Sequence, residues 1–187
     1  MTGPAQLSNE LESLLRRIAR GDNDAFAAFY DHTKARVYGL VIRVLRDPGY
    51  SEETTQEVYL EVWRSASDYD PARGSALAWL LTMAHRRAID RVRSEQAGSR
   101  RESRYGAANV DLASDVVSDS AIAGDERRRV AQCLEALTEA QRQCIELAYY
   151  GGLTYAEVSQ RLAANLSTIK SRIRDALRGL RNCLDVS

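Results

Sequence analysis

Apolar residues recur at helical spacing along most of the chain, and the alternation typical of strands is nearly absent. Four segments in the first half each carry one apolar stripe and stop at a glycine, a proline or a loop. They begin near Ser8, Asp22, Ser51 and Ser75, and the last one runs to about Arg93. Short connections between amphipathic helices are typical of a bundle. The pattern therefore predicts an all-α chain whose first half is one four-helix domain.

The composition changes between Ala97 and Gly124, where small and polar residues replace the large apolar ones. Helical periodicity returns at Asp125 and continues through a capping box that opens at Thr138. We therefore predict two small helical domains joined by a flexible linker. The predicted boundaries are 1–97 for the first domain, 98–125 for the linker and 126–187 for the second domain.

The most specific pattern in the second domain runs from Leu153 to Leu184. It predicts two amphipathic helices joined by a short turn, the first opened by a capping box of Thr154 and Glu157, the second capped by Ser167. The apolar stripe of the second helix consists of Ile169, Ile173, Leu177, Leu180 and Leu184. This layout is typical of a helix-turn-helix that reads duplex DNA.

The outward face of that second helix combines short polar residues with longer basic ones. The candidates for contacts with duplex DNA are Ser167, Thr168, Lys170, Ser171, Arg172 and Arg174. Short polar side chains suit base edges, and the longer basic ones suit phosphates. The alternative is a C-terminal helical hairpin whose basic face is merely solvated.

A second candidate nucleic-acid site lies on the helix predicted from Ser75 and on the loop before it. One helix face carries leucines and alanines for the core, and the opposite face carries an aromatic ring among arginines. The candidates are Tyr69, Arg73, Trp79, Arg86, Asp90 and Arg93. Rings that stack on bases and guanidinium groups that follow the backbone suit single-stranded nucleic acid, and the loop could hold an extruded base. The alternative is that Trp79 lies half-buried under Met83 and that the arginines only solvate the helix.

The formal net charge is zero, because 26 basic residues balance 26 acidic ones. Charge is nevertheless segregated along the chain. Residues 83–104 hold seven arginines against three acids, and residues 161–187 hold six basic residues against two acids. Between them, residues 105–125 carry four aspartates and no basic residue. Two local basic surfaces separated by an acidic tether therefore matter more than the neutral sum.

The three cysteines are scattered, without a C-x-x-C pair or a nearby histidine, so we expect no zinc site. Cys144 lies in an apolar stretch and is interpreted as a small core residue. Cys133 and Cys183 lie in the first and last helices of the second domain and could approach disulfide distance if those helices pack together. Because cytoplasmic thiols are reduced by default, such a bridge would sense redox state rather than hold the fold permanently.

Catalytic chemistry has few candidate residues. His32 and His85 lack the spacing of a triad or a metal site, and Glu57 and Glu61, four residues apart, lack the Glu-x-x-His motif of a carboxylate-metal bundle enzyme. No secretory signal is visible, and the longest apolar run, 76–81, is too short to span a bilayer. We therefore expect a cytoplasmic protein that is not an enzyme and needs no cofactor, metal or small-molecule substrate.

Five short motifs carry a family resemblance. They are Gly21-Asp22 with Ala25-Phe26, E-E-T-T-Q-E-V-Y from Glu52, A-W-L-L-T-M-A from Ala78, G-L-T-Y-A-E-V from Gly152 and T-I-K-S-R from Thr168. Together they resemble an extracytoplasmic-function (ECF) sigma factor of bacterial RNA polymerase with regions 2 and 4 only. The chain departs from this family at Arg86, where asparagine is usual, at Glu53, where aspartate is frequent, and at 163–165, where Gly-x-Pro is usual.

The resemblance implies partners and roles. One helix of the first domain would dock on the clamp helices of the β′ subunit through Glu53, Gln56, Glu57, Tyr59, Glu61 and Trp63. The loop and helix that follow would melt and read the −10 element of promoter DNA, and the helix-turn-helix would read the −35 element. The linker would run through the RNA exit channel of core RNA polymerase, which contains the β and β′ subunits. An anti-sigma factor, often membrane-anchored, would hold such a protein inactive.

The nearest alternative is a stand-alone helix-turn-helix regulator, which leaves the first domain unexplained. Such a regulator would footprint promoter DNA without polymerase. A sigma factor of this class would bind duplex DNA weakly by itself and would direct core polymerase to specific start sites.

Overall fold

The computed structural model describes residues 4–102 and 121–184, and every regular element in these ranges is helical. The chain divides into two compact units, Met1–Ser114 and Asp115–Ser187. The prediction of an all-α chain with two helical domains is therefore confirmed. Residues 103–120 of the predicted linker lie outside the described residues. None of the described helices is both long and apolar enough to cross a membrane.

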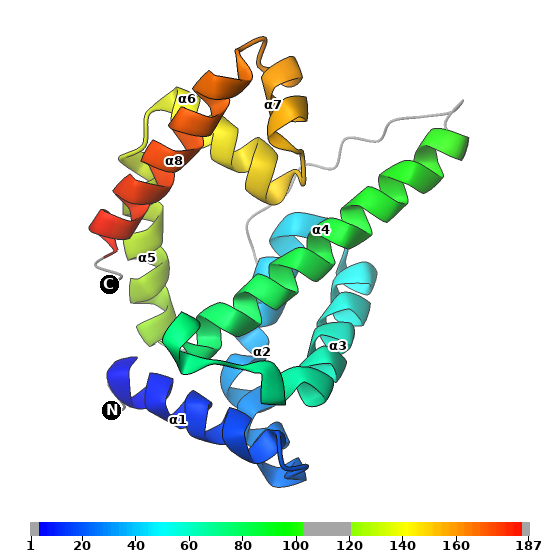
Figure 1. The fold of residues 1–187 in the computed structure, drawn as a ribbon, viewed down its shortest axis with the longest axis vertical. Helices are drawn as coiled ribbons and strands as arrows, with labels where there is room; N and C mark the ends of the chain where they lie inside the picture. The colour runs from blue at the N-terminus through cyan, green and yellow to red at the C-terminus, as the bar shows by residue number, and fades with distance from the viewer. Residues whose placement is uncertain (1–3, 103–120, 185–187) are drawn as a thin grey trace. The chain divides into compact units, whose positions relative to one another are not determined.

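The described part of the first unit contains four α-helices and two 3-10 turns (Figure 1). They are α1 (Pro4–Ile18), α2 (Asn23–Leu45), α3 (Pro48–Ser65), η1 (Ala66–Asp68), η2 (Pro71–Arg73) and α4 (Ala76–Glu102). Helices α2, α3 and α4 pack on one another, and α1 packs on α2, α4 and η1. The largest fully buried side chains of this unit are Leu11, Leu15, Ile18, Phe29, Thr33, Val37, Val41, Val58, Val62 and Leu80.

The start of α3 differs from the sequence prediction by one helical turn. Asp47 is the N-cap residue, and its side chain accepts a hydrogen bond from the Tyr50 amide at 2.8 Å. Pro48 occupies the first turn, where its fixed φ favours the helix and its missing N–H costs nothing. Ser51, the expected cap, is buried and donates its hydroxyl to the Asp47 carbonyl. The Asp47-Pro48 pair therefore starts α3 directly after the end of α2.

Two helices extend into the range predicted as linker. α4 continues to Glu102, beyond the expected end near Arg93, and α5 begins at Ala121 rather than at Asp125. Residues 94–102 contain no proline and include glutamate, glutamine, alanine and arginine, which all favour helix. Loss of the apolar stripe therefore did not mark the end of α4.

The described part of the second unit contains α5 (Ala121–Glu135), α6 (Glu139–Ile145), a π-helical turn η3 (Glu146–Tyr150), α7 (Tyr155–Arg161) and α8 (Leu166–Cys183). α8 packs on α6 and α7 and also contacts α5 (Figure 1). The core consists of Leu137, Cys144, Ile145, Val158, Ile169, Ile173 and Ala176. Both predicted capping boxes are present, with Thr138 opening α6 and Thr154 opening α7. The interpretation of Cys144 as a buried core residue is also confirmed.

α8 differs from its predicted form at two places. It begins at Leu166, so Ser167 belongs to its first turn and is not the cap. Leu177, assigned to the apolar stripe, is 51% exposed, and Ala176 takes the buried position. At 100° per residue, Ala176 lies about 20° from Ile169 around the helix, whereas Leu177 lies about 80° away. The inward face of α8 is therefore narrower than the sequence pattern suggested.

The turn between α7 and α8 requires an unusual backbone conformation. Ala163 has a φ of 47°, in the left-handed region where a Cβ crowds the backbone. The turn is closed by hydrogen bonds from the Ala163 amide to the Gln160 carbonyl and from the Ala164 amide to the Ser159 carbonyl. The Ser159 hydroxyl returns a bond to the Ala164 carbonyl at 2.6 Å. These bonds hold Ala163 in a conformation that glycine adopts without strain.

Replacing Ala163 with glycine should stabilise the second unit by about 0.5–1 kcal/mol, because the strain of the left-handed alanine exceeds the extra entropy of unfolded glycine. Thermal unfolding of wild type and Ala163→Gly measures the difference. Ala131→Gly, at an exposed position of α5, is the matched control and should destabilise by a similar amount. A lower melting temperature for Ala163→Gly would contradict the assignment of strain to this turn.

Candidate nucleic-acid and partner interfaces

The six docking candidates of α3 have different environments. Gln56 and Glu57 are exposed, and Trp63 is 38% exposed. Tyr59 is buried, with 4% of its surface exposed. The other two candidates are carboxylates paired with arginines of α4. Only part of the predicted set therefore offers its side chain to a partner in this conformation.

Tyr59 is a core residue at the interface of α2 and α3. Its hydroxyl lies 2.7 Å from that of the buried Thr33, which itself donates to the Phe29 carbonyl at 2.6 Å. Tyr59 therefore serves as the donor to Thr33. The Tyr59 ring also makes edge contacts with Tyr30 and Phe26, at centroid distances of 4.7 and 6.3 Å. Burial raises the pKa of the Tyr59 hydroxyl far above its ordinary value, so it stays protonated.

Two ion pairs join α3 to α4. The Nε atom of Arg87 lies 2.5 Å from a Glu61 carboxylate oxygen, and the Glu61 hydrogen bond raises the pKa of Arg87. An Nη atom of Arg91 lies 3.1 Å from Glu53, and its guanidinium lies 4.3 Å from the centre of the Tyr50 ring. These carboxylates, which the family resemblance assigned to docking, already neutralise basic residues of the same bundle.

A surface that mixes apolar and polar side chains lies on the outer faces of α2 and α3. We define the α2–α3 patch as Tyr30, Gln56, Glu57, Leu60 and Trp63. Tyr30 is 39% exposed and Leu60 is 56% exposed. Half-buried Phe26 supports the patch from below, because its ring makes an edge contact with Trp63 at 5.3 Å. Tyr30 and Leu60 are not among the six predicted docking residues.

The loop between α3 and α4, residues 68–75, is held by its own side chains. The Tyr69 hydroxyl donates to the Gly74 carbonyl at 3.0 Å, and the Tyr69 ring makes an edge contact with Trp79 at 5.8 Å. Asp70 accepts a hydrogen bond from the Ala72 amide at 2.9 Å. Gly74 has a φ of 139°, which favours glycine. The structure thus brings together the two aromatic candidates, Tyr69 and Trp79.

The remaining candidates of this site are charged and exposed. Arg73 belongs to the loop, and Arg86, Asp90 and Arg93 follow along α4. Trp79 and Arg86 are seven residues apart, which places them on one face about 10 Å from each other along the axis. Trp79 is half-buried, as the structural alternative required, but its ring contacts that of Tyr69. The arrangement offers aromatic edges at one end and guanidinium groups beyond them.

The six helix-turn-helix candidates lie within the first three turns of α8. Ser167, Lys170 and Arg174 are exposed, and Thr168, Ser171 and Arg172 are half-buried. The Ser171 hydroxyl donates to the Thr168 carbonyl at 2.9 Å, and the Arg174 Nε atom lies 3.3 Å from Asp175. The N-terminal turns of a recognition helix are the ones that reach base edges. The position of these residues suits that role.

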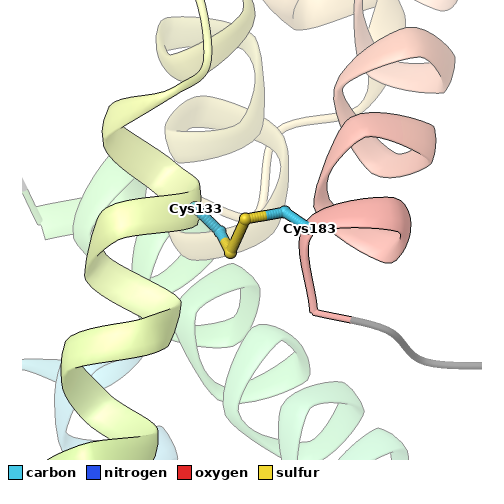
Figure 2. Close-up of a disulfide and its surroundings, with 2 residues drawn as sticks. All are labelled: Cys133 and Cys183. Atoms are coloured by element: carbon cyan, nitrogen blue, oxygen red, sulfur yellow. A yellow bond between two sulfur atoms is a disulfide. The ribbon is translucent and has the colours of Figure 1, made fainter.

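Cys133 and Cys183 form a disulfide that joins α5 to the end of α8 (Figure 2). Their Cα atoms lie 5.8 Å apart, within the normal range for a disulfide. Cys133 is 4% exposed, whereas Cys183 lies in the exposed last turn of α8. The two helices therefore pack as the pairing hypothesis required.

Among the described residues, no group of three or more histidines, cysteines, aspartates or glutamates could hold a metal ion. Glu61, one of the two carboxylates considered for a metal site, is bound to Arg87. The geometry at α3 therefore gives the carboxylate-metal interpretation no support.

Known proteins resemble both units of the chain. The Sigma-70 region 2 family matches residues 29–98, and the Sigma-70, region 4 family matches residues 133–182. The chain is 82% identical to the ECF RNA polymerase sigma factor SigK of Mycobacterium ulcerans (strain Agy99) and 80% identical to that of Mycobacterium tuberculosis (strain ATCC 25618 / H37Rv), each over the full length of both chains. A solved structure, Rhodobacter sphaeroides SigE in complex with the anti-sigma ChrR, is 33% identical, with 92% of this chain and 97% of that chain covered and a TM-score of 0.47.

Tyr59→Phe should lower the free energy of unfolding of the first unit by about 1 kcal/mol, because it removes the donor to the buried Thr33 hydroxyl. Chemical denaturation followed by circular dichroism measures the change. Tyr30→Phe is the matched control, since Tyr30 lies in the same aromatic cluster but is 39% exposed, and it should change the stability little. Equal effects of the two substitutions would show that the buried hydrogen bond is not what distinguishes Tyr59.

Proposed function

Because the chain belongs to the ECF sigma factors of bacterial RNA polymerase, we propose that its two units read two separate promoter elements while the first unit also docks on the polymerase. Sigma factors bind core RNA polymerase and promoter DNA and initiate transcription; they are not enzymes. The observation that supports the proposal is the presence of two unlike surfaces. One is an aromatic loop followed by a helix with exposed arginines in the first unit, and the other is a helix-turn-helix in the second. In this proposal region 2 spans 1–97, the linker 98–125 and region 4 126–187.

Docking on core polymerase is assigned to the α2–α3 patch. Aromatic residues at the centre of a mixed apolar and polar surface are the usual energetic anchors of protein interfaces. Trp63 and Leu60 would supply buried area on the β′ clamp helices, and Gln56 and Glu57 would supply polar contacts. Glu53, Glu61 and Tyr59 would act indirectly, since their contacts hold α3 against α4 and α2.

Capture of the −10 strand is assigned to residues 68–75 and the outer face of α4. Tyr69 and Trp79 would receive an unpaired base, and Arg73, Arg86 and Arg93 would follow the strand that carries it. Unstacking a base costs a few kcal/mol, which stacking and phosphate contacts would offset. The −35 element would be read as duplex by the six candidates of α8 in the major groove.

Control by an anti-sigma factor is proposed by analogy, since the SigE relative was solved in complex with one. Such a partner, membrane-anchored in our proposal, would act on this factor in the cytoplasm, where the polymerase is. The disulfide between Cys133 and Cys183 suggests that the redox state of the second unit affects that control. Reduction would release α5 from the end of α8 and so loosen any partner surface that depends on both helices.

Run-off transcription with core polymerase, followed by mapping of start sites, tests the division of labour. Arg172→Ala should weaken binding to the −35 duplex about tenfold, whereas Trp79→Ala should spare duplex binding and reduce strand opening about tenfold. Permanganate reactivity of unpaired thymines measures opening. Arg178→Ala, an exposed basic residue further along α8, is the charge-matched control for Arg172.

Identical failure of Arg172→Ala and Trp79→Ala at closed-complex formation would contradict the division of labour. Specific footprints on promoter DNA by the chain without polymerase, with no start sites directed in its presence, would favour the stand-alone regulator instead.

Reduction of the disulfide should lower the free energy of unfolding of the second unit by about 2–4 kcal/mol, because the bond joins residues 50 apart in the sequence. Denaturation with and without reductant measures this, and Cys183→Ser should make the stability insensitive to reductant. Under oxidising conditions the denatured protein should titrate one thiol, that of Cys144. Three titratable thiols under these conditions would eliminate the redox proposal.

A further inference from the structure

Helix α1 lies outside residues 29–98, which the region 2 family matches, yet it borders the proposed −10 site. It packs against η1, directly before Tyr69. Burial raises the pKa of the Tyr69 hydroxyl, the nearby Glu12 carboxylate raises it further, and Arg16 opposes the shift. Because α1 packs on η1, it places both charged groups near the start of the loop and the Tyr69 hydroxyl.

Arg16 and its neighbour Arg17 are held very differently. Arg17 lies 2.8 Å from Asp22, the residue that caps α2, so it takes part in the fold. Arg16 is 70% exposed, and its nearest carboxylate, that of Glu12, is 3.8 Å away. Its Nε atom makes only a long hydrogen bond, 3.4 Å, to the Glu12 carbonyl. An exposed, loosely paired guanidinium on this helix is available to an anion.

The anion that fits this position is a phosphate of single-stranded DNA. A base that reaches Tyr69 and Trp79 brings its own backbone to the rim of the loop, where Arg73 lies on one element and Arg16 on another. Basic side chains around aromatic rings are the arrangement with which proteins hold unpaired strands. Glu12 restrains Arg16 and also competes with the phosphate for it.

We propose that Arg16 binds a backbone phosphate of the unpaired −10 strand next to the base held at Tyr69 and Trp79, and that Glu12 weakens this contact. The proposal rests on the −10 site proposed above. It extends the DNA-binding surface of the first unit onto α1.

The test uses holoenzyme and a fork-junction fragment of a promoter at which wild type initiates, with the non-template strand unpaired across the −10 element. Fluorescence anisotropy measures its affinity between 0.05 and 0.3 M salt, about the range where counterion release is resolved. Arg16→Ala should weaken binding roughly threefold to tenfold and reduce the slope of log affinity against log salt by about 0.7. Arg43→Ala is the charge-matched control, because Arg43 is exposed in the last turn of α2. It should change neither the affinity nor the salt dependence.

The competing role of Glu12 gives a change of opposite sign. Glu12→Gln keeps the shape of the side chain, removes the restraining charge and should tighten binding to the same fragment by about twofold to threefold. A second test neutralises single phosphates of the unpaired strand with methylphosphonate. When the phosphate that Arg16 binds is neutralised, the wild type should lose affinity. On that fragment Arg16→Ala should bind as tightly as the wild type.

Three results would overturn the proposal. The first is that Arg16→Ala binds the fork junction as tightly as Arg43→Ala does, while Trp79→Ala loses affinity. This result would support the −10 site but would show that Arg16 is not part of it. Another is a penalty of Arg16→Ala that persists at every neutralised phosphate. The third is unchanged binding by both Trp79→Ala and Arg16→Ala, which would remove the underlying −10 site as well. Melting temperatures of the free variants, expected to equal that of wild type, exclude misfolding as the cause.

Discussion

Close packing of α4 against α2 and α3 is the constraint on which the first unit depends. Its buried positions Ala76, Leu80, Ala84 and Ala88 recur every four residues, and all are fully buried. Three of the four are alanines, whose small side chains allow neighbouring helices to approach closely. This stripe fixes the rotation of α4 about its axis, so Trp79 turns toward the loop and Arg86 outward without any further interaction. The same packing brings Arg87 and Arg91 within reach of Glu61 and Glu53 on α3. The orientation of the proposed DNA surface is therefore a consequence of how the core is filled.

Segregation of charge along the sequence explains how a chain of zero net charge can present basic surfaces. The carboxylates of Asp22, Glu53 and Glu61 pair with Arg17, Arg91 and Arg87 and hold helices together. Arginines used in this way contribute little to the outer potential, because each is neutralised within about one side-chain length. Arg73, Arg86 and Lys170 are exposed, so their charge faces solvent. Net charge is a poor guide to nucleic-acid binding when acidic and basic residues occupy different segments of the chain.

The two capping boxes were predictable from the sequence, but the caps of α3 and α8 were not. Between helices, the approach of Cys133 and Cys183 was predicted, whereas the contacts of Tyr59 and Glu61 were not. The capping boxes at Thr138 and Thr154 depend on four consecutive residues, and both are present. The burial of Tyr59 depends on Thr33, which is 26 residues away, and the pairing of Glu61 depends on Arg87 at the same separation. Periodicity alone also cannot tell a core position from an exposed position at the edge of the core, which is why Leu177 was assigned inward. The family resemblance assigned roles to whole helices, but it could not say which of their side chains are exposed.

A loop at residues 68–75 that is ordered before DNA binds would lower the total free-energy cost of strand opening. Each base removed from the stack costs a few kcal/mol, and ordering a flexible loop at the same time would add a further cost per residue. Here the loop is already held by the bonds from Tyr69 to Gly74 and from Ala72 to Asp70. The start of the loop is fixed by η1, which packs against both α1 and α3. In the proposal, helix α1 would contribute twice: it supports the loop that would receive the base, and it would place Arg16 at the rim of that loop. A loop prepared in this way needs only the binding energy of the captured strand itself.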